Sequence, residues 1–150
     1  MSPYRSYKKW ATNQKKLAKK LKKLQTHAKL SKLILGNLKR IRYKRPMRNA
    51  ATFANEVFGK GISLTGIVND QENIGWKNFS LGRWSPLWQQ AQALHYQRIG
   101  SKKSAKRWTF AIIHHLMMTR WDLWQFRNKM KHAPDGPEAT ATNNDLNGQI

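Results

Sequence analysis

The sequence contains no cysteine, which excludes disulfides, zinc fingers and thiol-based catalysis together. Acidic residues are also scarce, because 7 Asp and Glu stand against 29 Lys and Arg, for a formal net charge of +22. So few carboxylates argue against a metal centre built from acidic ligands. Paired carboxylates, a Ser/His/Asp set and a phosphate-cradling glycine loop are all missing. We therefore expect no metal, no cofactor and no small-molecule substrate.

Long apolar runs are missing as well. No stretch approaches the roughly 20 apolar residues that a membrane span requires, and the N-terminus MSPYRSYKKW lacks the apolar core of a secretory signal. We expect an intracellular protein with a nuclear location, because lysine-rich segments of this kind can act as import signals.

What the sequence has in excess is positive charge. Self-repulsion at this charge opposes compaction, and an anionic partner offsets it. Nucleic acid, either RNA or DNA, is the favoured partner, since a strong excess of basic residues is typical of phosphate binding. An anionic membrane surface is the weaker alternative, and charge that serves only solubility or import is the third.

The charge is concentrated in the first third of the chain. Residues 1–50 hold 17 of the 29 basic residues and no acid. Within them, apolar and small residues recur at steps of three and four, which predicts a basic amphipathic helical arm over residues 1–45. Gly36 is expected to interrupt this helix, and Pro46 to end it near Lys44 or Arg45. The stripe is Leu17, Leu21, Leu24, Ala28, Ser31, Leu35 and Leu38.

The basic side chains of the arm are the main candidates for nucleic-acid contacts. Ammonium groups act as point charges, which favours backbone contact without base discrimination. Insertion of the leucine stripe into an anionic membrane and a role in import alone remain open. The predicted contact residues are Lys15, Lys16, Lys19, Lys20, Lys22, Lys23, Lys39, Arg40, Arg42, Lys44 and Arg45 in the arm, with Lys102, Lys103, Lys106 and Arg107 further along.

Residues 46–75 are interpreted as a connector. Residues 53–58 are expected to form one or two helical turns that stop at Gly59 and Gly61. The segment ISLTGIV, residues 62–68, is predicted to be a loop or a brief strand, because Gly66 breaks it.

Residues 76–134 are predicted to form a Trp-rich antiparallel helical hairpin. Ser85-Pro86 favours a helix start and Gly100 a helix stop. A second helix is expected from Ser101 or Ser104 to about His132. The fold class is therefore all-α, with a disordered polar tail over residues 135–150.

Six of the seven tryptophans lie within residues 76–124, and we interpret them as core. The alternative is base stacking, which needs exposed rings beside basic groups. A hairpin of about 60 residues has little interior. A homodimer, or docking of the basic arm, is expected to complete the core.

The hairpin region resembles a known domain. The pattern is Ile74-Gly75-Trp76, Phe79, Gly82-Arg83, Ser85, Trp88, Tyr96, Arg107-Trp108, Leu123-Trp124, Arg127-Asn128 and His132. It is similar to a domain found beside reverse transcriptases in retroelement-derived proteins of algae and related protists. The match covers about residues 70–132, and it implies a retroelement origin rather than a mechanism. A degenerate fragment of an element, without a selected function, is a further alternative.

The last part of that region also resembles the motif of HEPN ribonucleases, in which Arg and a polar residue precede His on a helix. Arg127, Asn128 and His132 fit its spacing. The resemblance implies metal-independent RNA cleavage in a dimer, with His moving a proton and Arg holding the phosphate. The structural interpretation, which we favour, is that Arg127 and His132 solvate a helix C-terminus, where cations are stabilised.

Overall fold

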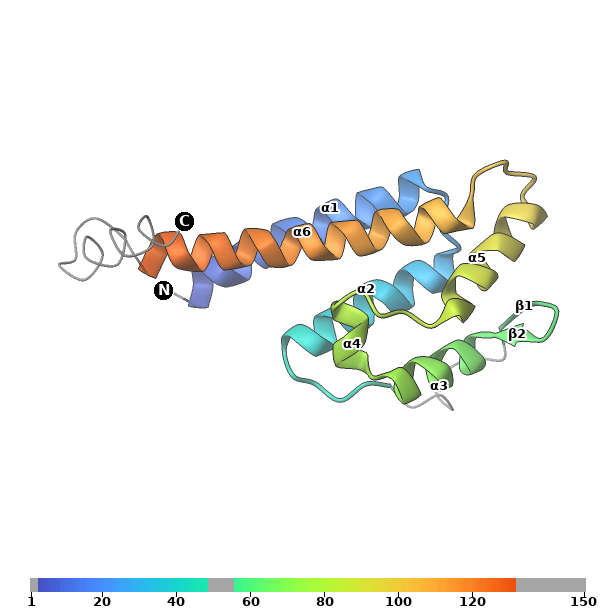
Figure 1. Cartoon of the computed structure of the whole chain (residues 1–150), viewed down its shortest axis with the longest axis horizontal. Coiled ribbons are helices and arrows are strands. Elements are labelled where there is room, and N and C mark those ends of the chain that lie inside the picture. Colours follow the sequence, from blue (N-terminus) through green and yellow to red (C-terminus); the bar gives the residue numbers. More distant parts are fainter. Residues whose placement is uncertain (1–2, 49–55, 132–150) are drawn as a thin grey trace, which may run out of the picture. The chain divides into compact units, whose positions relative to one another are not determined.

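Apolar residues recur at helical spacing through most of the chain, and the structure is correspondingly helical (Figure 1). Our computed structural model describes residues 3–48 and 56–131. These residues form six helices and one two-stranded hairpin, which confirms the all-α fold. The elements are α1 (Pro3–Lys23), α2 (Ala28–Arg42), β1 (Val57–Gly59), β2 (Ile62–Ser63), α3 (Leu64–Ile74), α4 (Trp76–Ser80), α5 (Pro86–Arg98) and α6 (Ala105–Lys131).

The chain divides into two units. The larger unit is residues 14–117, and the smaller one joins residues 1–13 to residues 118–150, of which 3–13 and 118–131 are described. In the larger unit, α2 packs against α4, α3 packs against α4 and α5, and the β1–β2 hairpin packs against α5.

The basic arm predicted over residues 1–45 contains two helices, α1 and α2, which are separated by a tight turn. Gln25 adopts the left-handed conformation at φ 55°, and the N–H of Thr26 donates to the carbonyl of Leu21 at 3.0 Å. The N–H of Gln25 donates to the carbonyl of Lys22, also at 3.0 Å, which completes a Schellman motif at the end of α1. The prediction that Gly36 interrupts the helix was wrong, because Gly36 lies inside α2.

The turn also changes which face of the segment is buried. Leu17 and Leu21 of the predicted stripe are buried, but Ala28 is exposed and Ser31 is only half-buried. The break rotates α2 relative to a continuous helix, so the set of its residues that is buried shares only Leu38 with the predicted stripe. That set is Leu30, Leu33, Ile34, Asn37 and Leu38.

Packing of the basic arm, through α1 and α2, completes the core of the larger unit. Leu17, Leu21 and Leu30 belong to the same buried cluster as Trp88 and Trp108. Each of these five side chains is at most 1% exposed. At about 1.5–3 kcal/mol per buried large apolar side chain, this burial is a major stabilising contribution.

Side chains from α5 and α6 hold the turn between α1 and α2. Gln92, which is fully buried, donates to the carbonyl of Gln25 at 3.1 Å and accepts from the N–H of His27 at 3.1 Å. The hydroxyl of Tyr96 donates to the carbonyl of Leu24 at 2.7 Å, and the indole of Trp108 donates to the hydroxyl of Thr26 at 2.8 Å. Backbone groups that the helix ends leave unpaired are thereby satisfied.

The segment interpreted as a connector contains regular structure. Helical turns were expected over residues 53–58, of which residues 53–55 lie outside the described part of the chain. Val57 and Phe58 lie instead in strand β1, which pairs antiparallel with β2. The brief strand predicted at the start of ISLTGIV is confirmed by β2, but helix α3 was missed. Gly66 does not break α3, because it lies in the first turn, where its N–H donates to the hydroxyl of the N-cap Ser63 at 3.0 Å.

Both helices predicted for the Trp-rich region are confirmed. Ser85 caps α5 by accepting from the N–H of Leu87 at 3.1 Å, and Pro86 occupies the first helical position. Gly100, at φ 69°, follows the end of α5. Helix α6 is described up to Lys131, and its predicted end at about His132 lies outside the described residues.

The tryptophans do not all belong to the core. Trp88 and Trp108 are fully buried, and Trp76 and Trp84 pack against the same cluster. Trp121 and Trp124, however, are 50% and 54% exposed, so the core interpretation was wrong for these two. Helix α6 carries two apolar stripes, and the buried one is Trp108, Ile112, Leu116 and Leu123.

This difference predicts unequal effects on stability. Trp88→Ala should lower the free energy of unfolding by about 3–5 kcal/mol, because it leaves a cavity in the core and removes the indole that donates to Gln71 at 3.0 Å. Trp124→Ala, the matched control, should lower it by less than about 1 kcal/mol. Urea titrations followed by circular dichroism measure both values. Equal losses in the two variants would contradict the burial described above.

Candidate nucleic-acid interface

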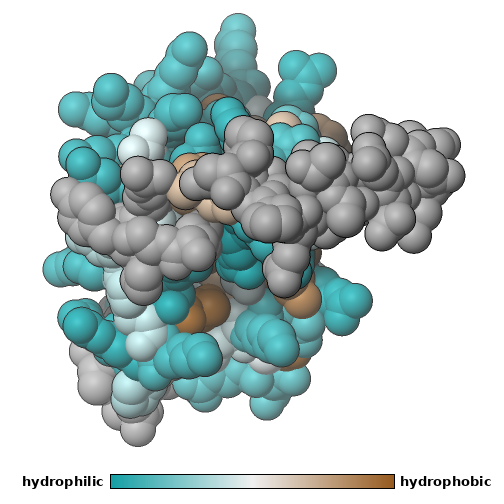
Figure 2. Space-filling view, turned by 90° about the vertical axis from the view of Figure 1, so that its left-hand side faces the viewer, coloured by the Kyte–Doolittle hydropathy of each residue, from teal (hydrophilic) through white to brown (hydrophobic). Residues whose placement is uncertain are grey.

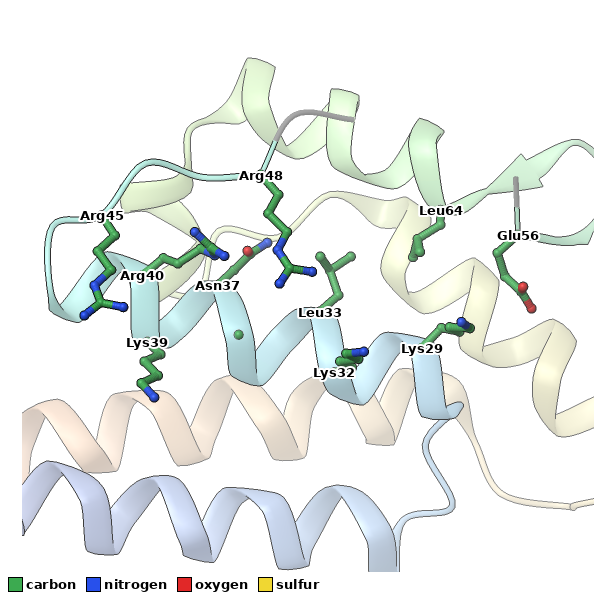
Figure 3. Close-up of a pocket in the computed structure, with 11 residues that line it drawn as sticks. Lys29, Lys32, Leu33, Asn37, Lys39, Arg40, Arg45, Arg48, Glu56 and Leu64 are labelled. Atoms are coloured by element: carbon green, nitrogen blue, oxygen red, sulfur yellow. The ribbon is translucent and has the colours of Figure 1, made fainter. Parts of the chain in front are cut away.

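Hydrophilic side chains cover most of the described surface that Figure 2 shows, with only small hydrophobic areas between them. On the larger unit, a pocket of about 410 Å³ lies beside α2. Cationic side chains dominate its lining, and Glu56 is the one acid among the residues that line it. The cations are Lys29, Lys32, Lys39, Arg40, Arg45 and Arg48, and the remaining lining residues are Leu33, Gly36, Asn37 and Leu64 (Figure 3).

Helical periodicity explains one wall of this basic pocket. Lys29, Lys32, Gly36 and Arg40 follow one another at steps of three and four, so they form one ridge along α2. The opposite side of α2 carries Leu30, Ile34 and Leu38 of the core, while the buried Leu33 lies between the two sides and also lines the pocket. Beyond the adjacent residues and the backbone of α2 itself, no heavy atom lies within 4 Å of the position that a Cβ on Gly36 would occupy, so this wall is open at the glycine.

A second Schellman motif brings the other cations back to α2. Lys44 adopts the left-handed conformation at φ 54°, and the N–H of Arg45 donates to the carbonyl of Arg40 at 2.8 Å. The chain then runs back along α2, and the guanidinium of Arg40 donates to the carbonyl of Pro46 at 3.0 Å. In Figure 3, the side chains of Arg40 and Arg48 consequently point into the same space.

The electrostatics of the pocket favour an anionic ligand. Six cations and one carboxylate give the lining a formal charge of +5. Like charges held this close repel one another, and bound phosphate groups would relieve that repulsion. Guanidinium groups can pair with phosphate oxygens in a bidentate manner. The volume also lies within the roughly 300–1,000 Å³ of typical ligand pockets, which is large enough for part of a nucleic-acid backbone.

The pocket brings together only part of the predicted binding set. Lys39, Arg40 and Arg45 line it. The other candidates lie elsewhere: Lys15, Lys16, Lys19, Lys20, Lys22 and Lys23 on α1, Arg42 and Lys44 at the end of α2, and Lys102, Lys103, Lys106 and Arg107 at or just before the start of α6. Most of these are exposed, whereas Lys20 and Arg42 are half-buried.

Three cations of the pocket are absent from the binding residues predicted from the sequence. Lys29 and Lys32 were recognisable from their helical spacing to Arg40, once α2 is known to be continuous through Gly36. Arg48 carried no such signal, because the reversal after Lys44 alone brings it to the pocket.

The candidate catalytic residues are described only in part. Arg127 is exposed and Asn128 is half-buried near the end of α6, while His132 lies outside the described residues. The geometry of the motif is therefore not defined, and the ribonuclease interpretation stays a prediction.

Among the described residues, no group of three or more His, Cys, Asp or Glu side chains could hold a metal ion. None of the helices within residues 3–48 and 56–131 is both long enough and apolar enough to cross a membrane.

A histidine pair lies at the start of α2, beside the pocket. His27 caps the helix, and its Nδ1 accepts from the N–H of Lys29 at 3.1 Å. Its Nε2 lies 3.7 Å from the carboxylate of Glu56, and its ring centroid lies 4.9 Å from that of His95. Burial lowers the pKa of His27, and the charges of His95, Arg98 and Lys29 lower this pKa further, while Glu56 raises it. Burial and the charge of Arg98 lower the pKa of His95, whereas a hydrogen bond that the imidazole donates to the backbone of Gln25 raises this pKa.

The lowered pKa values predict a loss of stability in mild acid. The folded state binds fewer protons than the unfolded state, in which histidine has a pKa of about 6.5. The contribution of His27 and His95 is thus complete above about pH 6.5 and is lost as the pH falls through their lowered folded-state pKa values. Protonation of His27 also removes the lone pair that accepts from Lys29.

Melting temperatures measured between pH 7.5 and pH 5 test this prediction. His27→Asn keeps a side chain that can cap α2 without titrating, so its melting temperature should fall less over this range than that of the wild type. His114→Asn, at an exposed position of α6, is the matched control. An equal fall in the wild type and in His27→Asn would contradict the role assigned to His27.

The arrangement was also compared with known proteins. No family model matches the chain. No curated protein is significantly similar to it, and no solved structure matches it significantly.

Proposed function

We propose that this protein binds nucleic acid through the phosphate backbone, with the basic pocket beside α2 as an anchoring site. The observation that carries the proposal is the set of six cations and one acid that lines this pocket. Four of those cations come from a single continuous helix, and the other two come from the segment that folds back onto it. The retroelement origin implied by the resemblance of residues 70–132 would supply such a partner.

The remaining candidates extend the contact without adding sequence preference. Lysines cover the exposed side of α1, and more basic residues lie at the start of α6. Flexible ammonium groups of this kind attract phosphates wherever the backbone passes and do not read base edges. Affinity should therefore depend strongly on salt and weakly on sequence.

Removal of pocket charge tests the anchoring site. Arg40→Gln with Arg48→Gln should raise the Kd for labelled RNA or DNA by at least about tenfold, because charged hydrogen bonds to phosphate are lost. The slope of log K against log salt should become shallower by about 1–2. Fluorescence anisotropy at several salt concentrations measures both quantities.

The matched control removes the same charge outside the pocket. Lys60 and Lys77 are exposed, belong to the same unit and do not line the pocket. Lys60→Gln with Lys77→Gln should raise the Kd much less. If the two double variants weaken binding equally, net charge rather than the pocket determines affinity. Failure of the wild type to bind RNA or DNA even in low salt would refute the proposed function.

The acid in the pocket predicts a gain of affinity. Glu56 repels a phosphate that enters the site, so Glu56→Gln should lower the Kd by about two- to fivefold in low salt. The gain should shrink as salt is added, because screening weakens the repulsion. Glu72→Gln, an exposed change of the same charge outside the pocket, is the control. An unchanged Kd for Glu56→Gln, measured by the same anisotropy titration, would place the phosphates elsewhere.

A further inference from the structure

Two tryptophans near the end of α6 stack on each other at the surface. The ring centroids of Trp121 and Trp124 lie 5.1 Å apart and the rings are tilted by 27°. Trp121 is 50% exposed and Trp124 is 54% exposed. Both belong to the smaller unit, whose part of α6 buries Leu123 on another side. Exposed large aromatic groups of this kind commonly mark an interaction site.

Cations surround this tryptophan pair. Arg120 precedes Trp124 by four residues and Arg127 follows it by three, so both are its neighbours on the helix surface. Both arginines are exposed, and Lys131 continues the basic surface at the end of the helix. Within residues 118–131, Asp122 is the one acid, and it is half-buried.

This combination fits one class of ligand. A purely apolar partner would leave the arginines without compensation, and a phosphate ligand alone would not use the rings. A nucleic-acid strand offers both an anionic backbone and flat bases that stack on indole. In a duplex the bases already stack on one another, so only an unpaired strand presents free base faces.

We propose that Trp121 and Trp124 form a stacking platform for the bases of single-stranded nucleic acid, with Arg120 and Arg127 bound to the adjacent phosphates. The platform rests on the proposed function and adds to it a preference for unpaired strands. At 5.1 Å the two rings already occupy a stacking distance. A base therefore stacks on an outer face of the pair rather than between the rings.

The platform and the basic pocket differ in their dependence on salt. Phosphate pairing weakens as salt rises, whereas stacking on a ring does not release counterions. Variants of the tryptophans should therefore weaken binding to single strands and leave the salt slope nearly unchanged. Variants of the pocket should change that slope for single strands and duplexes alike.

The experiment uses the full chain with fluorescein-labelled 15-nucleotide oligo(U), oligo(dT) and a duplex of equal length. For Trp121→Ala with Trp124→Ala, the Kd for both single strands should rise by about tenfold or more, and the Kd for the duplex should stay within about twofold. Quenching of the intrinsic tryptophan fluorescence by oligo(dT) should also decrease. Trp121→Phe with Trp124→Phe should retain most of the affinity, because phenylalanine still stacks.

Phe110→Ala is the matched control, because Phe110 lies on the same helix and is 72% exposed. An equal effect of Phe110→Ala, or equal weakening of single-strand and duplex binding in the tryptophan variant, would overturn the platform. So would unchanged nucleic-acid affinity together with a loss of self-association or of binding to anionic vesicles.

If the wild type binds single strands and duplexes equally and the tryptophan variant has the same affinities, the stacking platform alone is refuted. If the wild type binds neither, the proposed function fails with it.

Discussion

The turn between α1 and α2 is the constraint on which the larger unit depends. No acidic residue within the first fifty can offset the positive charge of the two helices. At this turn the chain changes direction while the apolar faces of α1 and α2 stay in the same core. Gln92 makes this possible, because its buried amide satisfies the carbonyl of Gln25 and the N–H of His27 together. Removal of that amide would take a hydrogen-bond partner from both backbone groups in a partly buried turn, at a net cost of about 0.5–1.5 kcal/mol per hydrogen bond.

The turn also sets the orientation of the basic pocket. Because α2 starts at the cap formed by His27, its rotation about its axis is fixed from the first residue. Leu30 and Ile34 then face the core, so Lys29, Lys32 and Arg40 share the opposite, solvent-facing side. The seven acids of the chain can neutralise only a minority of its 29 basic residues. Apolar burial and buried hydrogen bonds must consequently offset the repulsion that remains.

The sequence was sufficient to predict helix bounds where common capping residues mark them. Ser85-Pro86 and Gly100 predict α5 almost to the residue, because their conformational preferences are strong. Gln25 and Lys44 are different, since both adopt left-handed conformations that usually favour glycine. Tertiary hydrogen bonds hold Gln25 in that conformation, and no local pattern reveals those bonds. Gly66 led to a wrong prediction because a glycine was expected to break the segment. It lies instead in the first turn of α3, where its N–H donates to the N-cap Ser63.

The residues of the candidate sites also divide into those that the sequence predicts and those that depend on tertiary structure. The density of lysine and arginine predicted a basic surface, and three of the predicted residues do line the pocket. The remaining pocket cations come from helix continuity and from chain reversal, which are tertiary facts. The tryptophans of α6 were assigned to the core because periodicity identifies an apolar stripe and cannot tell which of two stripes is covered. Leu116 and Leu123 lie on the buried stripe, and Trp121 and Trp124 lie on the exposed one.

A charge of +22 would attract any polyanion, so affinity alone would not show that a site exists. Preorganisation separates a site from a generally basic surface. The hydrogen bond from Arg40 to the carbonyl of Pro46 restricts one guanidinium before any ligand arrives, and the open wall at Gly36 leaves space beside it. Ordering of a long side chain on binding opposes association by about 0.5–1.5 kcal/mol. In the basic pocket, part of this ordering occurs during folding, whereas the exposed lysines of α1 must lose their freedom when they bind.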